Sequence, residues 1–176
     1  MATPPTSHIA FISGPLDTGA DGLYFQRYYV PKINSAIKRG DHFIIGPLPH
    51  GVDADALEYL LAYPVSPDRI TIFVTPSEHT VWGSQFHAKG VGVSIVDGPT
   101  GAERDTTMTA ASTYDILRWR KQHEASAFYG RMFREGYVTN TERNWRRRQG
   151  LTETEPVNED EVDIFKGEST DEPRIS

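Results

Sequence analysis

The chain has 176 residues, of which 38% are hydrophobic and 24% charged, a balance typical of one soluble globular domain. It contains no cysteine, which excludes disulfides, thiolate catalysis and zinc–thiolate sites. No apolar run approaches the roughly 20 residues that a membrane helix needs, and residues 1–7 lack the basic and apolar segments of a secretory signal. We therefore expect a cytoplasmic protein with no membrane partner.

The net charge of −6 is distributed unevenly along the chain. Residues 151–176 carry nine acidic and two basic residues, which leaves residues 1–150 nearly neutral. An acidic segment with few large apolar residues cannot offset the entropy of ordering. We therefore expect a flexible N-terminus over 1–7, one folded domain over 8–150 and a disordered acidic tail over 151–176. The alternative for the tail is that Val162, Ile164 and Phe165 dock on the domain.

Short apolar runs alternate with amphipathic segments along the folded part. In chain order, the predicted elements are a strand at 8–13, a helix at 23–38 that Pro31 interrupts, a strand at 41–45, a helix at 53–62, a strand at 69–74, a short strand at 91–96, a helix at 102–112, a strand at 114–119, and helices at 121–133 and 139–148. The pattern is weakest over 75–103. This alternation predicts an α/β fold, a Rossmann-like parallel sheet flanked by helices in a single domain, with ligands at the carboxyl ends of the strands.

Two predicted strands end in the same Gly-Pro-Leu sequence, and both loops are candidate binding walls. In Gly14-Pro15-Leu16-Asp17, glycine lets the backbone approach a ligand, and Asp17 can accept hydrogen bonds from ribose hydroxyls. The alternative is that Asp17 bonds to the backbone of its own turn.

The second loop runs from Gly46 and Pro47 to Gly51 and Asp53. A helix that begins at Asp53 presents free N–H groups and the positive end of its dipole to an anion. The alternative is that Asp53 serves only as the N-cap of that helix. We favour ligand contact at this loop.

Further along the chain, Arg104 lies at a predicted helix start, where it can clamp a phosphate or form a surface ion pair. Thr139 and Asn140 begin the last predicted helix, and their short polar side chains suit phosphate oxygens. The Thr139-x-x-Glu142 spacing also fits a capping box, which explains both residues without a ligand.

Residues 128–148 hold six arginines and five aromatic residues, a composition that can bind nucleic acid. Because residues 1–150 are nearly neutral overall, we favour a small molecule over nucleic acid as the partner. The six histidines show no H-x-x-x-H or H-E-x-x-H spacing, so we expect no metal and no cofactor.

These loops, taken in order from His8 to Arg148, resemble the SLOG superfamily of Rossmann-like nucleotide-binding domains, which includes the cytokinin-activating LOG proteins and the DNA-processing DprA/Smf proteins. Ile12-Ser13-Gly14-Pro15-Leu16-Asp17 is similar to the family's first-strand turn G-s/p-R-D, with Leu16 where arginine is common. The stretch from Ile45 to Leu57 is similar to its G-(g/p)-x-x-G-x-D-x-x-A turn, and Arg104-Asp105-x-x-Met108 to its R-N/D-x-x-M helix start. The resemblance implies a nucleotide or NAD-derived ligand and, by analogy with related folds, a homodimer.

A more distant resemblance is to the nucleoside 2-deoxyribosyltransferase group, which also has an early G-P turn and uses a carboxylate nucleophile. The LOG enzymes carry P-G-G-x-G-T-x-x-E; here only Thr139-x-x-Glu142 matches that motif, and Gly136 is the one glycine before it. This resemblance implies cleavage or transfer at an N-glycosidic bond, with Asp17, Asp53 and Glu142 as the candidate catalytic carboxylates.

Three functions therefore stay open. The first is binding of a nucleotide or nucleotide-derived small molecule at the Gly/Pro-rich loops. The second is hydrolysis or transfer at the N-glycosidic bond of a nucleoside or its monophosphate. The third is a protein or nucleic-acid interaction module that uses the arginine and aromatic segment.

Overall fold

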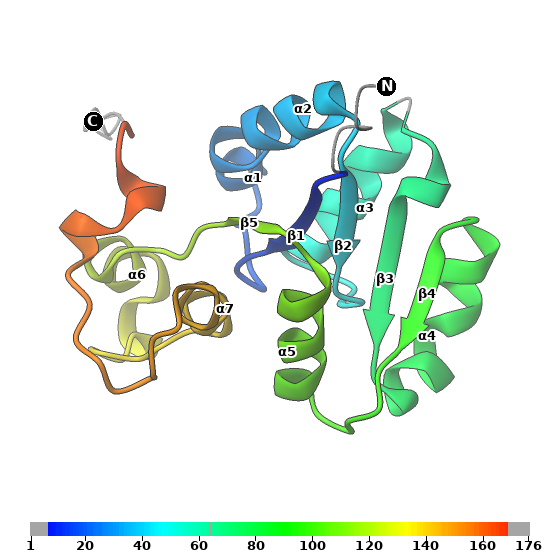
Figure 1. Cartoon of the computed structure of the whole chain (residues 1–176). Coiled ribbons are helices and arrows are strands. Elements are labelled where there is room, and N and C mark those ends of the chain that lie inside the picture. The colour runs from blue at the N-terminus through cyan, green and yellow to red at the C-terminus, as the bar shows by residue number, and fades with distance from the viewer. Residues whose placement is uncertain (1–6, 64, 169–176) are drawn as a thin grey trace, which may run out of the picture.

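A computed structural model describes residues 7–63 and 65–168, and Figure 1 shows their arrangement. Five strands form one sheet in which every pairing is parallel, in the order β4-β3-β2-β1-β5. The strands are β1 (Ile9–Ser13), β2 (His42–Ile45), β3 (Ile70–Val74), β4 (Gly92–Ile95) and β5 (Tyr114–Leu117). The predicted α/β fold, with a Rossmann-like parallel sheet in a single domain, is confirmed.

Seven α-helices flank the sheet within the described residues. They are α1 (Leu23–Tyr28), α2 (Val30–Arg39), α3 (Val52–Ala62), α4 (Pro76–Ala88), α5 (Gly101–Ala111), α6 (Gln122–Tyr129) and α7 (Asn140–Gln149). The helix predicted at 23–38 is two helices, which meet at Tyr29. Pro31 lies in the first turn of α2, the position where a missing N–H costs a helix nothing.

The two faces of the sheet are covered unequally. On one face, side chains from α1, α2, α3 and α4 share a large core with Ile12, Ile45 and Ile72. The opposite face has a small core of Phe11, Ile44, Phe73, Val96 and Met108, the last from α5. Successive strand residues point to opposite faces, and right-handed crossovers in one direction place their helices on one side. The return from β4 to β5 therefore places α5 on the other side.

The connections change direction at β1, which pairs with both β2 and β5. From β1 the chain proceeds to β2, β3 and β4, and then returns to β5 on the far side of β1. Such a switch point is where open α/β sheets bind ligands. The loops that follow β1, β2 and β5 all begin at this edge.

Helix α4 is the element that the sequence pattern did not predict. Few of its residues are buried, since only Gly83 and Phe86 lie in the interior and Val81 is 64% exposed. An amphipathic stripe is therefore missing from its sequence. The capping box that Thr75 forms with Glu78, with Pro76 between them, begins the helix and is the signal that could have identified it.

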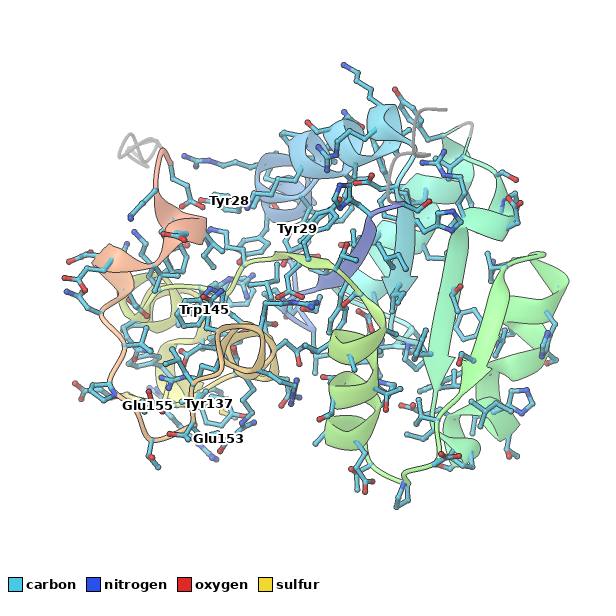
Figure 2. All side chains as sticks on the ribbon, viewed as in Figure 1. Tyr28, Tyr29, Tyr137, Trp145, Glu153 and Glu155 are labelled. Atoms are coloured by element: carbon cyan, nitrogen blue, oxygen red, sulfur yellow. The ribbon has the colours of Figure 1, made fainter. Side chains whose placement is uncertain are left out.

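Residues 151–168 pack against the domain, so the predicted disordered tail is wrong over this range. Val162 and Phe165 are buried against Leu117 and Trp119, and Figure 2 shows Trp145, Glu153 and Glu155 on the same side of the molecule. Arginines of the domain form ion pairs with the acidic residues of this segment. Arg118 pairs with Glu168 at 2.8 Å, and Arg143 with Glu153 at 2.9 Å.

Residues 169–176 of the predicted tail and 1–6 of the predicted flexible N-terminus lie outside the described residues. Within the described part of the chain, every helix is too short or too polar to cross a bilayer.

Candidate functional site

A crevice follows the carboxyl edge of the sheet across the ends of β2, β1 and β5. It consists of an inner cavity of about 60 Å³, a middle cavity of about 180 Å³ and an outer cavity of about 390 Å³. The inner and middle cavities share Gly14, Pro15, Leu16, Asn140 and Thr141. The middle and outer cavities share Trp119, Arg120, Ala125, Tyr129, Tyr137 and Thr139. The three cavities therefore adjoin one another.

The two Gly-Pro-Leu loops contact each other directly at the inner end. The Val52 N–H donates a hydrogen bond to the Pro15 carbonyl at 3.1 Å. Gly51 has φ +75°, and a Cβ at this position would clash with the backbone carbonyls of Pro15 and Leu16. Gly51 is thus required for loop-to-loop packing, and it does not line the crevice.

Gly14 makes room for a buried tyrosine at the switch point. A Cβ at position 14 would clash with the Tyr29 hydroxyl and with Val52. The Tyr29 hydroxyl donates to the Ser13 carbonyl at 2.7 Å and accepts from the Arg118 N–H at 2.9 Å. One phenol therefore links the end of β1 to the residue that follows β5.

Asp53 lines the inner cavity, and the alternative that it serves only as an N-cap is wrong. Helix α3 begins one residue earlier, at Val52, with Gly51 as its N-cap. The Asp53 carboxylate instead accepts a long hydrogen bond of 3.4 Å from the Leu48 N–H. A Cβ at Gly46 would clash with this carboxylate, so Gly46 provides the space that Asp53 occupies.

Burial raises the pKa of Asp53 from its ordinary 3.8 to about 7. The nearby carboxylates of Asp105 and Glu78 also raise this pKa, whereas the Arg104 guanidinium lowers it. Burial likewise raises the pKa of Asp105, against the opposing effect of Arg104. Because its pKa is about 7, the Asp53 carboxyl group can hold or release a proton near neutral pH.

Arg104 lines the inner cavity, but carboxylates already surround its guanidinium. It pairs with Glu78 and, at 3.2 Å, with Asp105. Glu78 is in turn fixed by accepting the Thr75 N–H at 2.8 Å. Arg104 is buried and both of its carboxylate partners are partly buried, so these are not surface ion pairs. Arg104 therefore links the first turn of α5 to the first turn of α4, and much of its capacity to clamp a phosphate is already engaged.

The start of α7 forms the wall opposite the two loops. Asn140 and Thr141 line the inner and middle cavities, and Thr139 lines the middle and outer ones. Thr139 is the N-cap and accepts the Glu142 N–H at 3.1 Å. The Glu142 carboxylate does not complete a capping box. It pairs with Arg146 at 2.6 Å and lines a separate cavity.

Asp17 is exposed and lies beyond the three cavities. Its carboxylate accepts the Gly19 N–H at 2.9 Å, which closes the local turn, and its carbonyl accepts from Arg120 at 2.8 Å. Of the predicted site residues, the crevice brings together Gly14, Pro15, Gly46, Asp53, Arg104, Thr139 and Asn140. It does not include Asp17, Pro47, Gly51 or Glu142.

Among the lining residues that were not predicted, Ser13 and Trp119 each carry a polar side-chain atom without a partner in the part of the chain that the structure describes. Ser13 lines the inner cavity, and Trp119 lines the middle and outer cavities. The Ser13 Oγ and Trp119 Nε1 atoms are buried, and neither has a hydrogen-bond partner among the described residues. Unpaired buried donors are costly and rare. Each is therefore an unused hydrogen-bond donor on a residue that lines the crevice. Their positions, at or just past a predicted strand end, are the sequence signal for them.

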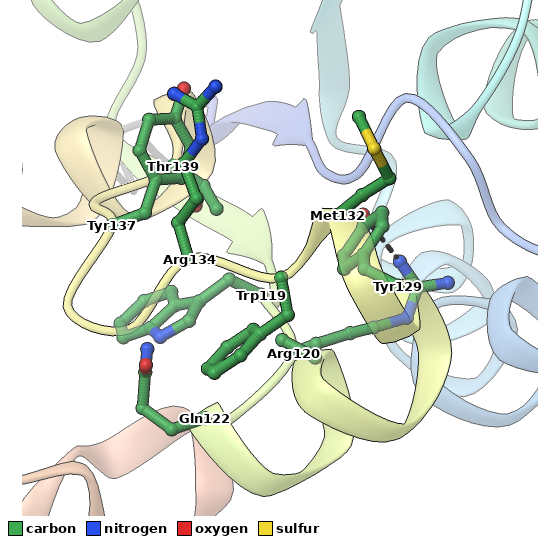
Figure 3. Close-up of a pocket in the computed structure, with 10 residues that line it drawn as sticks. Trp119, Arg120, Gln122, Tyr129, Met132, Arg134, Tyr137 and Thr139 are labelled. Atoms are coloured by element: carbon green, nitrogen blue, oxygen red, sulfur yellow. Dashed lines mark hydrogen bonds between the residues drawn. The ribbon is translucent and has the colours of Figure 1, made fainter.

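The outer cavity is wide and aromatic (Figure 3). Tyr129 and Tyr137 are 40% and 53% exposed, and Met132 is 78% exposed. Arg120 donates to the Tyr129 hydroxyl at 3.1 Å and lies 3.6 Å from the centre of the Phe128 ring. These contacts fix the aromatic wall beside the middle cavity.

The arginines of residues 128–148 do not form one free basic face. Arg143, Arg146 and Arg148 pair with carboxylates, and Arg147 donates to Asn144 at 2.7 Å. Arg131 and Arg134 are exposed. This arrangement gives the interaction-module hypothesis no specific support.

Comparison of the chain with models of protein families, with curated proteins and with solved structures gives no match in any of the three.

Proposed function

We propose that the chain binds a nucleotide or a nucleotide-derived small molecule in the crevice. The observation that carries the proposal is the continuity of a small polar inner cavity with a wide aromatic outer cavity at the switch point of the sheet. A nucleotide has the same polarity, because its sugar and phosphate form a polar part and its flat base forms the other end. Small-molecule sites commonly combine an apolar pocket with a few convergent polar groups.

The volumes favour one orientation of the ligand. The inner cavity, at about 60 Å³, takes a small polar group and not a whole ring. Sugar hydroxyls would therefore point toward Asp53 and Ser13, while the bulk of the ligand fills the middle and outer cavities. The base would stack on the aromatic wall that Tyr129 and Tyr137 form, as bases do on aromatic side chains.

An anionic group would sit at the start of α7 rather than on Arg104. Three carboxylates, Asp53, Glu78 and Asp105, surround Arg104, so a phosphate there would meet like charges. Helix N-termini favour anions through free N–H groups and the helix dipole. Asn140 and Thr141 present this end of α7 to the crevice.

The proposal is tested by thermal shift and calorimetry against nucleosides, nucleotides, NAD and ADP-ribose, with a matched pair of variants. Ser13→Ala and Thr109→Val each remove a buried hydroxyl that has no partner among the described residues, but only Ser13 lines the crevice. Both variants should unfold at an equal or slightly higher urea concentration than the wild type. Only Ser13→Ala should bind the best ligand of the panel more weakly. Equal ligand affinity in both variants, or no binding across the panel, would contradict the proposal.

A second candidate function, cleavage at an N-glycosidic bond, is favoured by Asp53. Of the three candidate carboxylates, only Asp53 lines the crevice. Its pKa of about 7 leaves part of this group ionised at neutral pH, and the carboxylate can stabilise an oxocarbenium-like transition state at the sugar. Incubation of the wild type with the nucleosides and monophosphates of the panel, followed by chromatography, should reveal free base. Asp53→Asn should abolish the release while retaining ligand binding. Panel ligands that bind without any base release would leave binding as the sole function.

A further inference from the structure

Strand β4 is an edge of the sheet, and its outer backbone groups have no hydrogen-bond partner among the described residues. It pairs with β3 alone, and β5 forms the opposite edge (Figure 1). The Val96 N–H donates to the Val74 carbonyl at 2.9 Å. Backbone groups alternate between the two sides of a strand, so those of Ser94 also face β3, whereas those of Val93 and Ile95 face outward. An open edge of this kind is a template for pairing with another strand.

The sequence of β4 lacks most of the devices that keep sheet edges apart. Natural edge strands commonly carry a charged residue, a proline or a bulge that prevents pairing. Residues 91–96 are Val-Gly-Val-Ser-Ile-Val, without a charge or a proline. The register of β4 on β3 runs without a bulge from Gly92 to Ile95, and Ile95 is 51% exposed. The short length of the strand is the one such device that remains.

The strand is self-complementary when two copies run antiparallel. With Val93 on the two-fold axis, the two Val93 residues face each other, and Val91 faces Ile95 of the second copy. These outward-facing residues form hydrogen-bonded pairs, each of which exchanges two backbone hydrogen bonds. Gly92 and Ser94 then face each other with small side chains. Such an interface is isologous, because the same residues meet from both copies.

Charges of opposite sign flank the strand. Lys89 precedes it and Asp97 follows it, each four positions from Val93. Both side chains are exposed, and neither forms an ion pair with another described residue. An antiparallel pair brings the start of one strand beside the end of the other, so Lys89 of each copy lies near Asp97 of the second copy. A parallel arrangement of the strands would not neutralise these charges.

We propose that β4 is a homodimer interface, in which the β4 strands of two copies pair antiparallel about a two-fold axis at Val93. The two five-stranded sheets thereby become one continuous sheet. The three cavities of the crevice contain no residue of β4, so the interface is independent of the proposed nucleotide binding. Because β4 is four residues long, the paired strands bury little surface, and the dimer is a weak one.

The first test is sedimentation equilibrium of the full-length chain, which should show a monomer–dimer equilibrium. Ile95→Lys places a lysine on each of the paired edges and should weaken the dimer by at least about tenfold, because edge lysines oppose pairing. Thermal unfolding of the monomer should change little, since Ile95 is half-exposed. Leu23→Lys is the matched control, because Leu23 is 59% exposed on α1, and it should dimerise as the wild type does.

Exchange of the flanking charges tests the antiparallel register. Lys89→Glu and Asp97→Lys should each weaken the dimer several-fold, because like charges then meet at both ends of the strand pair. The combined variant brings opposite charges together again and should dimerise as the wild type does. Lys38→Glu is the control for the change of charge, because Lys38 is also an exposed lysine at the C-terminal end of a helix.

The proposal is overturned if the wild type sediments as a monomer at every concentration up to about 1 mM. It is also overturned if Ile95→Lys dimerises as tightly as Leu23→Lys. A dimer that both single charge variants weaken and the combined variant does not restore would contradict the antiparallel pairing about Val93.

Discussion

The two ends of the crevice are built from different parts of the chain and are held by different forces. The inner end is lined by the loops after β1 and β2 and by α5 and α7. Ion pairs of Arg104 link α5 to α4, and a backbone contact at a glycine with positive φ joins the two loops. The outer end is formed by residues 119–139, and the C-terminal segment supports it from behind through Phe165 and Glu168. The polar groups of the inner end are therefore held in place by contacts within the domain. The shape of the outer end instead depends on packing by Phe165, which lies about 45 positions after Trp119 in the chain.

The largest effect is expected where the inner end depends on backbone contact. Gly51→Ala should lower the free energy of unfolding by about 3 kcal/mol or more, because the new Cβ meets two carbonyls and the backbone conformation strains any other residue. Urea denaturation measures this loss. Gly150→Ala is the matched control, since Gly150 also has positive φ but open space around it, and it should lose about 1 kcal/mol. Equal losses would show that the two loops do not depend on this contact.

A smaller loss is expected behind the outer end. Phe165 packs edge-on against Trp119, with ring centres 5.2 Å apart. Phe165→Ala should cost about 2–3 kcal/mol of unfolding free energy, below the usual range for a central core phenylalanine because the cluster is small. It should also reduce the near-ultraviolet circular dichroism of the tryptophans. If the variant keeps both the wild-type signal and stability, residues 151–168 do not support the outer wall.

The pH dependence of stability distinguishes the charged inner end from the aromatic one. Because the folded-state pKa of Asp53, about 7, lies above its ordinary 3.8, the folded state holds this proton more tightly than the unfolded chain does. The contribution of Asp53 to stability is therefore greatest below pH 3.8 and declines as the pH rises to about 7, above which it is constant.

Asp53→Asn removes this titration, so its stability relative to the wild type should increase between pH 4 and pH 7. Urea unfolding of both proteins across this range measures the difference. Asp105 and the other carboxyl groups are present in both proteins, so their contributions largely cancel. Parallel pH profiles would mean that the environment of Asp53 is not the one described.

The smallest effect on stability is expected at the exposed outer wall. Tyr137→Ala should change the free energy of unfolding by no more than about 0.5 kcal/mol. It should nevertheless weaken binding of the best panel ligand by about tenfold, the size of a lost stacking contact with a base. Tyr63→Ala, an exposed tyrosine outside the crevice, serves as the comparison. Equal affinity in the two variants would place the base elsewhere.

The sequence predicted the sheet well, because β1, β2, β3 and β5 are short apolar runs bounded by turn residues. It also predicted the crevice edge, since strand ends carry the loops of a parallel sheet. Helix α4 was missed because its buried face is small. Residues 151–168 were assigned to a disordered tail because composition does not reveal that Glu168 pairs with Arg118 and Glu153 with Arg143.

Single residues of the site were harder to predict than its location. The N-cap alternative for Asp53 fails because α3 starts one residue earlier than predicted, which leaves the Asp53 carboxylate free to line the inner cavity. Asp17 and Glu142 have the right residue type at strand or helix ends, yet a turn and Arg146 engage their side chains. Only tertiary contacts decide whether Ser13 or Trp119 finds a partner.

The Tyr29 hydroxyl keeps the ends of β1 and β5 apart in the absence of a ligand. Ser13 and Leu117 are the last residues that pair β1 with β5, and beyond them the two strands separate. The phenol donates to one strand and accepts from the other, so it takes the place of the peptide group that would have continued the ladder. The Tyr29 hydroxyl oxygen thereby bridges the two strands where they diverge. A ligand that enters between them meets a preorganised opening and is spared the free energy of separating the strands.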